Sequence, residues 1–549
     1  MAVVSFGHAN KITQAREHLA RNEMRQAEEI AREILQADPK NGGGLHLIAT
    51  IAFRTGHGED AAKWLRMAVA QEPNNADFWN DLTAVYSALG KWDEAAESCQ
   101  RVVTLVPQFA DGFYNYGLCL FQLGLIDEAM ACYKRAVALR PSFAEAHSIY
   151  LYTLNFHPHY TGDYILDMHK HWNLTQAQML APVARPARRE RAAGRKLRVG
   201  YVSSHFRAHP VGRFFEPLLR EHDRSQFEIF LYADMAHGDP LTARLQGLGD
   251  AWRVIFGQND AQVAEQVRQD GIDILVDLNL HSEGNRLMMF ARKPAAVQAC
   301  HLAYCGTTGL GTMDYRLSDP VLDPAGVEGP YTEKTVRVPG CYWCYQPPAE
   351  AAAVIPMPRN DVVFGCLNHF AKVSPQALEA WARILGRVPG SRLLMLAPEG
   401  RARKRVTSVL GQRGVAAERI EFVSQMPAAS YYSTHWRIDV ALDPFPFTGR
   451  TTTCDALWMG VPVVTLRGNR AVGRSGASIL TALGLGEWIA GNVDEYVEIA
   501  VKLAGDKAGR QRAGVGMRER MQNSPLMDAK GYAREVEEAY RKMWDGAGN

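Results

Sequence analysis

The 549-residue sequence predicts a multidomain fold, in which an N-terminal all-α repeat superhelix precedes two doubly wound α/β halves. Three observations predict it. Prolines recur at a constant interval in the first quarter of the chain, short β-branched runs alternate with helical segments from Leu197, and a second such series begins near residue 361. Three or four domains are expected at this length. The 47% hydrophobic and 22% charged residues supply large cores.

The overall charge excludes some classes of partner. The formal net charge is only +2, from 61 basic and 59 acidic residues, which gives no electrostatic footprint for a nucleic acid. No run of about 18 apolar residues occurs, so we expect no membrane span. The N-terminus lacks the layout of a secretory signal. Nine cysteines in so long a chain do not indicate a disulfide framework, which favours a cytoplasmic location.

The first 143 residues carry an internal repeat. Prolines lie 34 residues apart, at Pro39, Pro73, Pro107 and Pro141. Alanines follow in the same phase, at Ala27, Ala61, Ala95 and Ala129, and glycines at Gly56, Gly90 and Gly124. This is the period of the tetratricopeptide repeat. A small alanine lets two helices cross closely, a glycine leaves the first helix in a left-handed conformation, and a proline ends the second. We therefore predict about four repeats in residues 1–143.

Two segments join the repeats to the remainder of the chain. Residues 144–180 keep a helical pattern without the repeat signature, so we expect further helices there. Residues 181–196, APVARPARRERAAGRK, are basic and rich in proline and arginine. A nucleic-acid arm is one interpretation of this composition, but a solvated linker or loop is favoured. The concave face of the repeats is expected to hold extended peptides.

Two Rossmann-like halves follow, at residues 197–350 and 351–525, and a C-terminal helix is expected at 526–549. Strands are predicted in the first half at LRVGYVS, FEIFLYA, DILVDLNL and VQACHLAYC, and in the second at DVVFGCLN, SRLLMLAP, RIEFVSQM, IDVALDPF and VPVVTL. Alternation with helices argues for parallel sheets covered on both faces. The proline-rich stretch YQPPAEAAAVIPMPRN makes a hinge. The cleft at the carboxyl ends of the strands is the expected ligand site.

One CxxC pair, Cys341 and Cys344, raises the possibility of half a zinc site. No second CxxC or clustered histidine pair accompanies it, and Tyr342 and Trp343 fill the gap. We therefore favour ordinary thiols in an aromatic-rich strand and expect no metal.

The stretch DPFPFTGRTTTCDALWMGVPVVTL predicts a phosphate site. Gly449 allows close backbone approach, and three threonines (451–453) fill the first turn of a helix, whose free N–H groups attract anions. Arg450 adds a full charge. Asp455, one turn inside, could accept hydrogen bonds from ribose hydroxyls. The alternative is a threonine that only caps the helix, but a cap needs one threonine, so a nucleotide diphosphate site is favoured.

The diphosphate charge must be met by the protein's own cations, because neither a P-loop nor an Asp-x-Asp pair occurs. Lys372 follows the first strand of the second half and is favoured for this role over a solvated lysine. In the first half, the loop VSSHFRAHPVG brings Ser203, Ser204, His205 and His209 after a strand. The two histidines could act as acid or base or contact a phosphate. The alternative is that they only form hydrogen bonds within the loop.

The segments RVGYVSSHFRAHP, LAYCGTTGLGTMDY, CLNHFAK and TGRTTTCDALWMGVPVVTL, placed after helical repeats, together resemble the O-linked N-acetylglucosamine transferase and SPINDLY family. With four repeats, the chain is similar to a bacterial-type homologue. The resemblance implies a GT-B glycosyltransferase fold, inversion at the anomeric carbon, and no metal or other cofactor. It implies transfer from UDP-N-acetylglucosamine (UDP-GlcNAc) to serine or threonine of acceptor proteins held by the repeats.

The resemblance also implies site residues. The catalytic pair would be His209, as general base or contact, and Lys372, which stabilises the departing diphosphate. Substrate-binding residues would be Asn368, His369, Leu302, Ala303, Thr307, Met426, Tyr431, Arg450, Thr451, Thr452 and Asp455. Four positions depart from the animal enzymes: residues 205–208 replace Asp-Phe-Gly-Asn, Arg450 replaces a histidine, His369 replaces a glutamine, and Tyr431 replaces a histidine that stacks on uracil.

Two alternatives remain open at this stage. The same chemistry could use another donor, GDP-fucose or UDP-glucose, or the chain could be a repeat scaffold with a vestigial sugar-nucleotide site. The joint presence of Lys372, His209 and Asp455 favours an enzyme.

Overall fold

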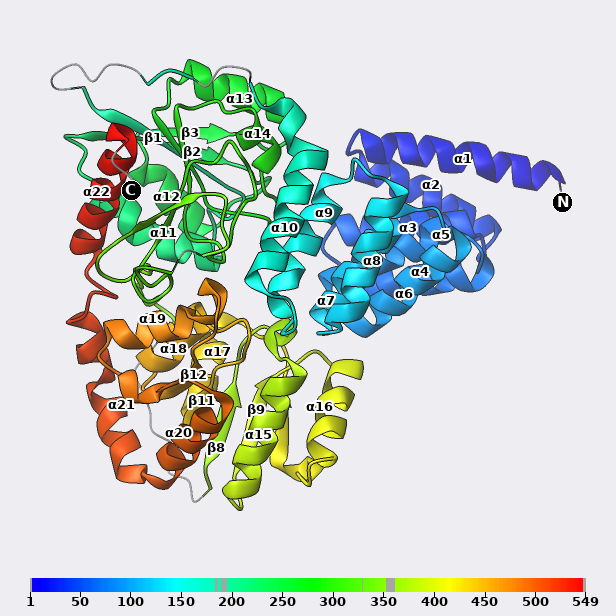
Figure 1. The fold of residues 1–549 in the computed structure, drawn as a ribbon. Coiled ribbons are helices and arrows are strands. Elements are labelled where there is room, and N and C mark those ends of the chain that lie inside the picture. The colour runs from blue at the N-terminus through cyan, green and yellow to red at the C-terminus, as the bar shows by residue number, and fades with distance from the viewer. Residues whose placement is uncertain (1, 183–185, 189–194, 328, 352–360, 547–549) are drawn as a thin grey trace. The chain divides into compact units, whose positions relative to one another are not determined.

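The computed structural model describes residues 2–182, 186–188, 195–327, 329–351 and 361–546. It divides into two compact units. One holds the repeats through Ala146 together with Ala397–Arg405, and the other holds His147–Leu396 and the chain from Val406 onward. The fold class predicted from the sequence is confirmed, with a helical repeat unit and two parallel α/β sheets (Figure 1).

The repeat unit consists of four antiparallel helix pairs (Figure 1). Their helices are α1 (Ala2–Ala20), α2 (Met24–Ala37), α3 (Gly42–Arg54), α4 (Gly58–Gln71), α5 (Ala76–Ala88), α6 (Trp92–Leu105), α7 (Ala110–Gln122) and α8 (Ile126–Leu139). Gly56, Gly90 and Gly124 take positive φ angles of 85°, 70° and 68° between paired helices. The four in-phase alanines are 0% exposed, as close helix crossing requires.

Two shorter helices follow the repeats, α9 (Ala144–Thr153) and α10 (Gly162–Trp172). Single turns at Leu154–Phe156, Asn173–Ala177 and Gln178–Leu180 complete this region. The predicted basic linker at 181–196 lies partly outside the described residues, at 183–185 and 189–194.

The N-terminal half contains a seven-stranded parallel sheet in the order β3-β2-β1-β4-β5-β6-β7. Its strands are β1 (Leu197–Ser203), β2 (Phe227–Ala233), β3 (Ala251–Val254), β4 (Ile274–Asp277), β5 (Val297–Cys300), β6 (Tyr315–Ser318) and β7 (Lys334–Arg337). Its helices are α11 (Pro210–Glu221), α12 (Pro240–Leu248), α13 (Asp260–Gln269) and α14 (Leu287–Ala291). The strand predicted at VQACHLAYC stops at Cys300, because Leu302, Ala303 and Cys305 adopt positive φ angles.

The C-terminal half contains a six-stranded parallel sheet in the order β10-β9-β8-β11-β12-β13. Its strands are β8 (Val363–Cys366), β9 (Arg392–Leu396), β10 (Ile420–Val423), β11 (Val440–Leu442), β12 (Val463–Leu466) and β13 (Ile489–Ala490). Its helices are α15 (Pro375–Arg387), α16 (Arg401–Gly411), α17 (Ala428–Thr434), α18 (Thr451–Trp458), α19 (Ser475–Ala482), α20 (Val493–Gly505) and α21 (Lys507–Gln522). Most of the predicted hinge, 352–360, lies outside the described residues.

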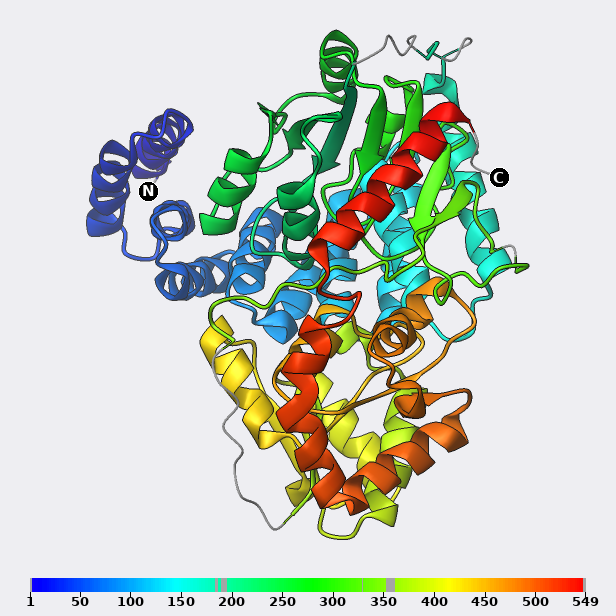
Figure 2. The same ribbon diagram turned by 90° about the vertical axis from the view of Figure 1, so that its left-hand side faces the viewer.

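The last helix, α22 (Ala529–Asp545), returns to the N-terminal half and packs against α11 (Figures 1 and 2). A buried contact joins them, in which Glu537 lies 2.9 Å from His222 Nδ1. This return ties the end of the chain to the helix that carries part of the candidate site.

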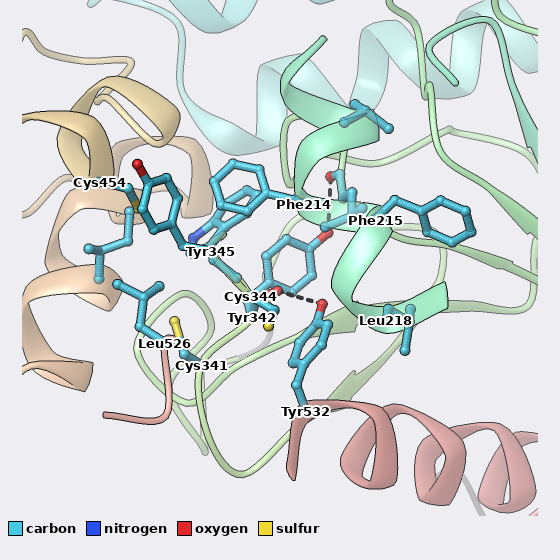
Figure 3. Close-up of a cluster of buried hydrophobic side chains, with 14 of the residues drawn as sticks. Phe214, Phe215, Leu218, Cys341, Tyr342, Cys344, Tyr345, Cys454, Leu526 and Tyr532 are labelled. Atoms are coloured by element: carbon cyan, nitrogen blue, oxygen red, sulfur yellow. Dashed lines mark hydrogen bonds between the residues drawn. The ribbon is translucent and has the colours of Figure 1, made fainter. Parts of the chain in front are cut away.

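The segment GCYWCYQ lies at this junction and is not a strand, which corrects the prediction from its aromatic composition. Cys341, Cys344 and the three aromatic residues between and after them are buried, and Tyr532 of α22 donates a hydrogen bond to the Tyr342 carbonyl at 2.8 Å (Figure 3). Within the described ranges, no group of three or more His, Cys, Asp or Glu side chains could hold a metal ion. The two cysteines are therefore part of an apolar core.

Candidate functional site

Helix α18 starts at the point where the sequence predicts a phosphate site. Thr451 is its first residue, and Arg450 occupies the N-cap position without a side-chain capping hydrogen bond. No threonine side chain caps this helix, which disfavours the interpretation of the threonines as a simple cap. Thr452 instead donates its hydroxyl hydrogen to Asn368 Oδ1 at 2.7 Å. The first-turn N–H groups therefore face the site without a side-chain acceptor from the N-cap residue.

The loop before α18 is shaped by Asp443. Its Oδ1 accepts a hydrogen bond from Gly449 N at 2.6 Å, and its Oδ2 accepts one from the Thr465 hydroxyl at 2.7 Å. Burial raises the pKa of Asp443 to about 6. A Cβ atom at Gly449 would lie 2.5 Å from the Thr453 hydroxyl and 2.7 Å from Asp443 Oδ1. A side chain at this position would therefore displace the loop or the first turn of α18.

Lys372 reaches the same loop from the end of β8. It ends the single turn Phe370–Lys372, and its Nζ donates to the Thr448 carbonyl at 3.0 Å and lies 4.7 Å from the Phe447 ring centre. Burial, and next the nearby Arg450 charge, lower the pKa of Lys372 to about 7. Among the described residues, neither of these two cations forms an ion pair with a carboxylate. The nearby Asp443 carboxylate acts on Lys372 in the opposite direction to Arg450 and less strongly, so the positive charge of the two groups is only partly offset, as suits an anion site.

Arg450 connects the two halves. Its Nη1 donates to the Ala303 carbonyl in the loop after β5, and its guanidinium lies 5.1 Å from the Phe447 ring and 5.5 Å from the Trp343 ring. Leu302 and Ala303 both adopt positive φ angles, 57° and 46°, and the Leu302 carbonyl accepts a hydrogen bond from the Tyr342 hydroxyl at 3.0 Å. The predicted sugar-lining loop and the predicted phosphate site are thus in direct contact.

His209 is the N-cap residue of α11. Its Nδ1 accepts a hydrogen bond from Val211 N at 3.2 Å, and its ring stacks on that of His205 with centroids 3.8 Å apart. Burial, followed by His205, Arg207 and Arg450, lowers the pKa of His209 to about 2. Because Nδ1 accepts, the neutral ring carries its proton on Nε2. His209 is therefore arranged as a hydrogen-bond donor, which weighs against the prediction that it is a general base.

Asp455, predicted to bind ribose, is 1% exposed. Its Oδ1 accepts hydrogen bonds from Arg213 Nη2 at 2.9 Å, from the Tyr345 hydroxyl at 2.8 Å and from the Tyr432 hydroxyl at 3.1 Å. A ribose would have to share this carboxylate, so the ribose contact stays a prediction. The sequence reading missed these three partners. Arg213 could have been found from its position one helical turn after His209.

The remaining predicted residues line the periphery. The Thr307 hydroxyl donates to Glu333 at 2.7 Å within its own half, and Met426 Sδ accepts from the Thr434 hydroxyl at 3.3 Å. The Tyr431 ring is edge-on to its neighbour His435. Thr307 thus belongs to the loop after β5, whereas the contacts described for Met426 and Tyr431 are with residues of the C-terminal half.

Two small cavities flank the cluster. One, of about 20 Å³, is lined by residues that include Asn368, Asp443 and Thr452. The other, of about 30 Å³, is lined by residues that include Thr307 and Arg470. Both are far smaller than the several hundred Å³ of a typical ligand site, so each has room for water but not for a nucleotide.

Comparison with known protein families decides the classification. Tetratricopeptide-repeat models match residues 18–84 and 85–142. The model of glycosyl transferase family 41 matches residues 135–346 and 350–536. The chain belongs to glycosyl transferase family 41. The cations, the α18 N-terminus and the loop after β5 all lie within the residues matched by the family 41 model.

A solved structure of a Thermobaculum terrenum O-GlcNAc transferase is 34% identical and superposes with a TM-score of 0.83, covering 99% of this chain and 98% of that one. This match confirms the GT-B fold. Curated plant relatives include a probable UDP-N-acetylglucosamine–peptide N-acetylglucosaminyltransferase SPINDLY from Solanum lycopersicum, 35% identical over 72% of this chain and 43% of its own length. A relative named SEC from Arabidopsis thaliana is 30% identical over 66% of this chain and 38% of its own. The chain spans less than half the length of these plant relatives. None of its described helices is long and apolar enough to cross a membrane.

Proposed function

We propose that this family 41 chain is an inverting, metal-independent protein O-glycosyltransferase that moves N-acetylglucosamine from UDP-GlcNAc to serine or threonine hydroxyls. The observation that carries the proposal is the pairing of Lys372 and Arg450, two cations without a carboxylate partner, at the N-terminus of α18. A departing diphosphate is negatively charged, so it can neutralise the positive charge of these two side chains.

In the proposed reaction, the acceptor hydroxyl attacks the anomeric carbon and the nucleotide diphosphate leaves from the opposite face. Lys372, Arg450 and the N–H groups of Thr451 and Thr452 hold the charge that develops on the leaving group. The attacking hydroxyl must lose its proton. Since His209 is arranged as a donor, a phosphate oxygen of the sugar nucleotide takes this proton, and His209 Nε2 donates a hydrogen bond to the reacting groups.

The proposal includes the partners. Acceptor proteins bind as extended segments along the repeat superhelix, whose stacked pairs provide a concave face. The names of the matched relatives, which specify a peptide acceptor and UDP-N-acetylglucosamine, support this assignment. We also propose a cytoplasmic location, because all nine cysteines are free thiols.

The donor is tested by thermal unfolding of the protein with a panel of UDP- and GDP-sugars. We expect stabilisation by UDP and UDP-GlcNAc. A larger shift with GDP-fucose or UDP-glucose would reassign the donor and keep the chemistry. Intact-mass analysis of acceptor proteins incubated with enzyme and UDP-GlcNAc then tests transfer, with Lys372→Ala as the control. Binding of a sugar nucleotide without any mass increase would identify a scaffold instead.

A further inference from the structure

Two helices direct their N-terminal turns at the candidate site, one from each half. Helix α11 follows its N-cap His209, and α18 begins at Thr451. Arg213 lies four residues after His209 and donates its backbone N–H to the His209 carbonyl at 3.0 Å. Asp455 lies four residues after Thr451. Each member of the Arg213–Asp455 pair is thus one helical turn from a predicted site residue.

The pair itself is short and enclosed. Arg213 Nη2 lies 2.9 Å from Asp455 Oδ1, and the two side chains are 22% and 2% exposed. A charge-assisted hydrogen bond in such a place is strong, and breaking it leaves a buried charge without its partner. This contact therefore helps to fix the separation of the two helix ends, together with the hydrogen bond from Arg450 to the Ala303 carbonyl.

Two tyrosines reinforce the pair. The hydroxyls of Tyr345 and Tyr432 donate to the same Asp455 oxygen, and the Tyr345 ring lies 5.9 Å from the Arg213 guanidinium. Figure 3 shows Tyr345 between Phe214, the neighbour of Arg213 on α11, and Cys454, the neighbour of Asp455 on α18. One side chain of the segment that connects the halves, Tyr345, thus contacts both members of the ion pair.

We propose that the Arg213–Asp455 ion pair is a clamp that fixes the first turn of α11 against the first turn of α18. Arg213 is a positioning residue in this proposal: it sets His209 opposite the phosphate-binding end of α18. The expected effect on kcat rests on the proposed function, because it requires glycosyltransferase activity. Diphosphate contacts come from the C-terminal half alone, and a substitution at Arg213 leaves the Asp455 carboxylate in place for the predicted ribose contact, so losing the clamp displaces His209 and leaves nucleotide binding largely intact. Displacement by about 1 Å costs on the order of a hundredfold in rate.

The test compares Arg213→Gln, Arg213→Lys and the control Arg220→Gln, which changes an exposed arginine on the same helix. We expect Arg213→Gln to lower kcat at least about tenfold while Kd for UDP stays within about threefold. Arg213→Lys keeps the charge and recovers part of the rate, and Arg220→Gln matches the wild type. In a His209→Ala background, Arg213→Gln should cost less than about twofold, because the group that it positions is gone.

Hydrogen exchange supplies a readout that needs no transferase activity. Peptides covering 205–216 and 447–458 should both exchange faster in Arg213→Gln, without nucleotide, while the repeats are unchanged. If the wild-type protein transfers no sugar, the proposed function is wrong. The hydrogen-exchange data would still show whether the ion pair holds the two helix ends together. Unchanged exchange in both peptides would overturn the clamp. So would an equal loss of kcat in the His209→Ala background, or a rise in Kd for UDP with kcat unchanged.

Discussion

Lys372 Nζ lies 3.0 Å from the carbonyl oxygen of Thr448, so the lysine is held against the loop that leads into α18. A backbone carbonyl does not neutralise an ammonium group, and Arg450 is two residues further along the same loop. In the free protein, Arg450 repels the Lys372 ammonium group, and the Asp443 carboxylate offsets this repulsion only in part. A bound diphosphate relieves that repulsion, and the first two predictions depend on it.

Lys372→Ala should lower kcat for sugar transfer by about a hundredfold or more, the usual scale for losing a donor to a developing oxyanion. UDP release, followed with a saturating acceptor protein, measures it. The matched control is Lys404→Ala, which removes a lysine on the outer helix α16. Turnover near that of the wild type in correctly folded Lys372→Ala protein would remove the lysine from the mechanism.

Donor affinity should fall as the pH rises through about 7. The pKa of Lys372 is lowered to about 7 in the free protein, so the ammonium form is present below this pH and is lost above it. A bound diphosphate favours the ammonium, so binding takes up a proton near neutrality. Calorimetry of UDP-GlcNAc binding in buffers of different ionisation enthalpy measures this uptake. Lys372→Ala should abolish it, and an uptake that survives this substitution contradicts the assignment.

His209→Gln and His209→Ala separate two roles for this residue. A glutamine amide can donate a hydrogen bond near the position of Nε2, whereas alanine cannot. If His209 donates, His209→Gln retains activity within about tenfold and His209→Ala loses about a hundredfold. If His209 instead accepts the proton of the attacking hydroxyl, both variants lose activity alike. Steady-state kcat of the two proteins decides between these outcomes.

Gly449→Ala should weaken UDP binding by at least about tenfold. The added methyl would lie 2.5 to 2.7 Å from the oxygens of Thr453, Thr452 and Asp443, so the end of α18 must shift. Gly411→Ala is the control, because a Cβ there meets nothing within 4 Å. Titration calorimetry with UDP measures both. Equal affinities for the two variants would show that UDP does not bind at the end of α18 that this clash displaces.

The regular parts of the fold were predictable from the sequence because local patterns specify them. The repeat helices were predicted from the spacing of prolines and glycines, and strands such as β1 and β8 from short apolar runs. Strand β6 was not predicted; it contains Arg316, whose charge is unusual in a buried strand and is paired there with Asp323. Strand β3 was missed because it is a short, half-exposed edge strand. Both depend on tertiary partners that lie outside a sequence window.

The candidate site shows the same division. The start of a helix at Thr451 and the position of Lys372 after a strand were predictable because both depend on local sequence, and their phosphate contacts stay predictions. The partnership of Asp455 with Arg213 was not predictable, since the two residues are 242 positions apart. The loop at Leu302 and Ala303 was predicted as part of a strand, because β-branched and apolar composition does not reveal a positive φ.

The central claim is that a nucleotide diphosphate binds where Lys372 and Arg450 meet the N-terminus of α18. A crystal structure of the protein with UDP tests it most directly. We expect the diphosphate oxygens within hydrogen-bond distance of Lys372 Nζ, the Arg450 guanidinium and the backbone N–H groups of Thr451 and Thr452. UDP bound at any other place, with both cations still turned towards protein carbonyls, would contradict the claim.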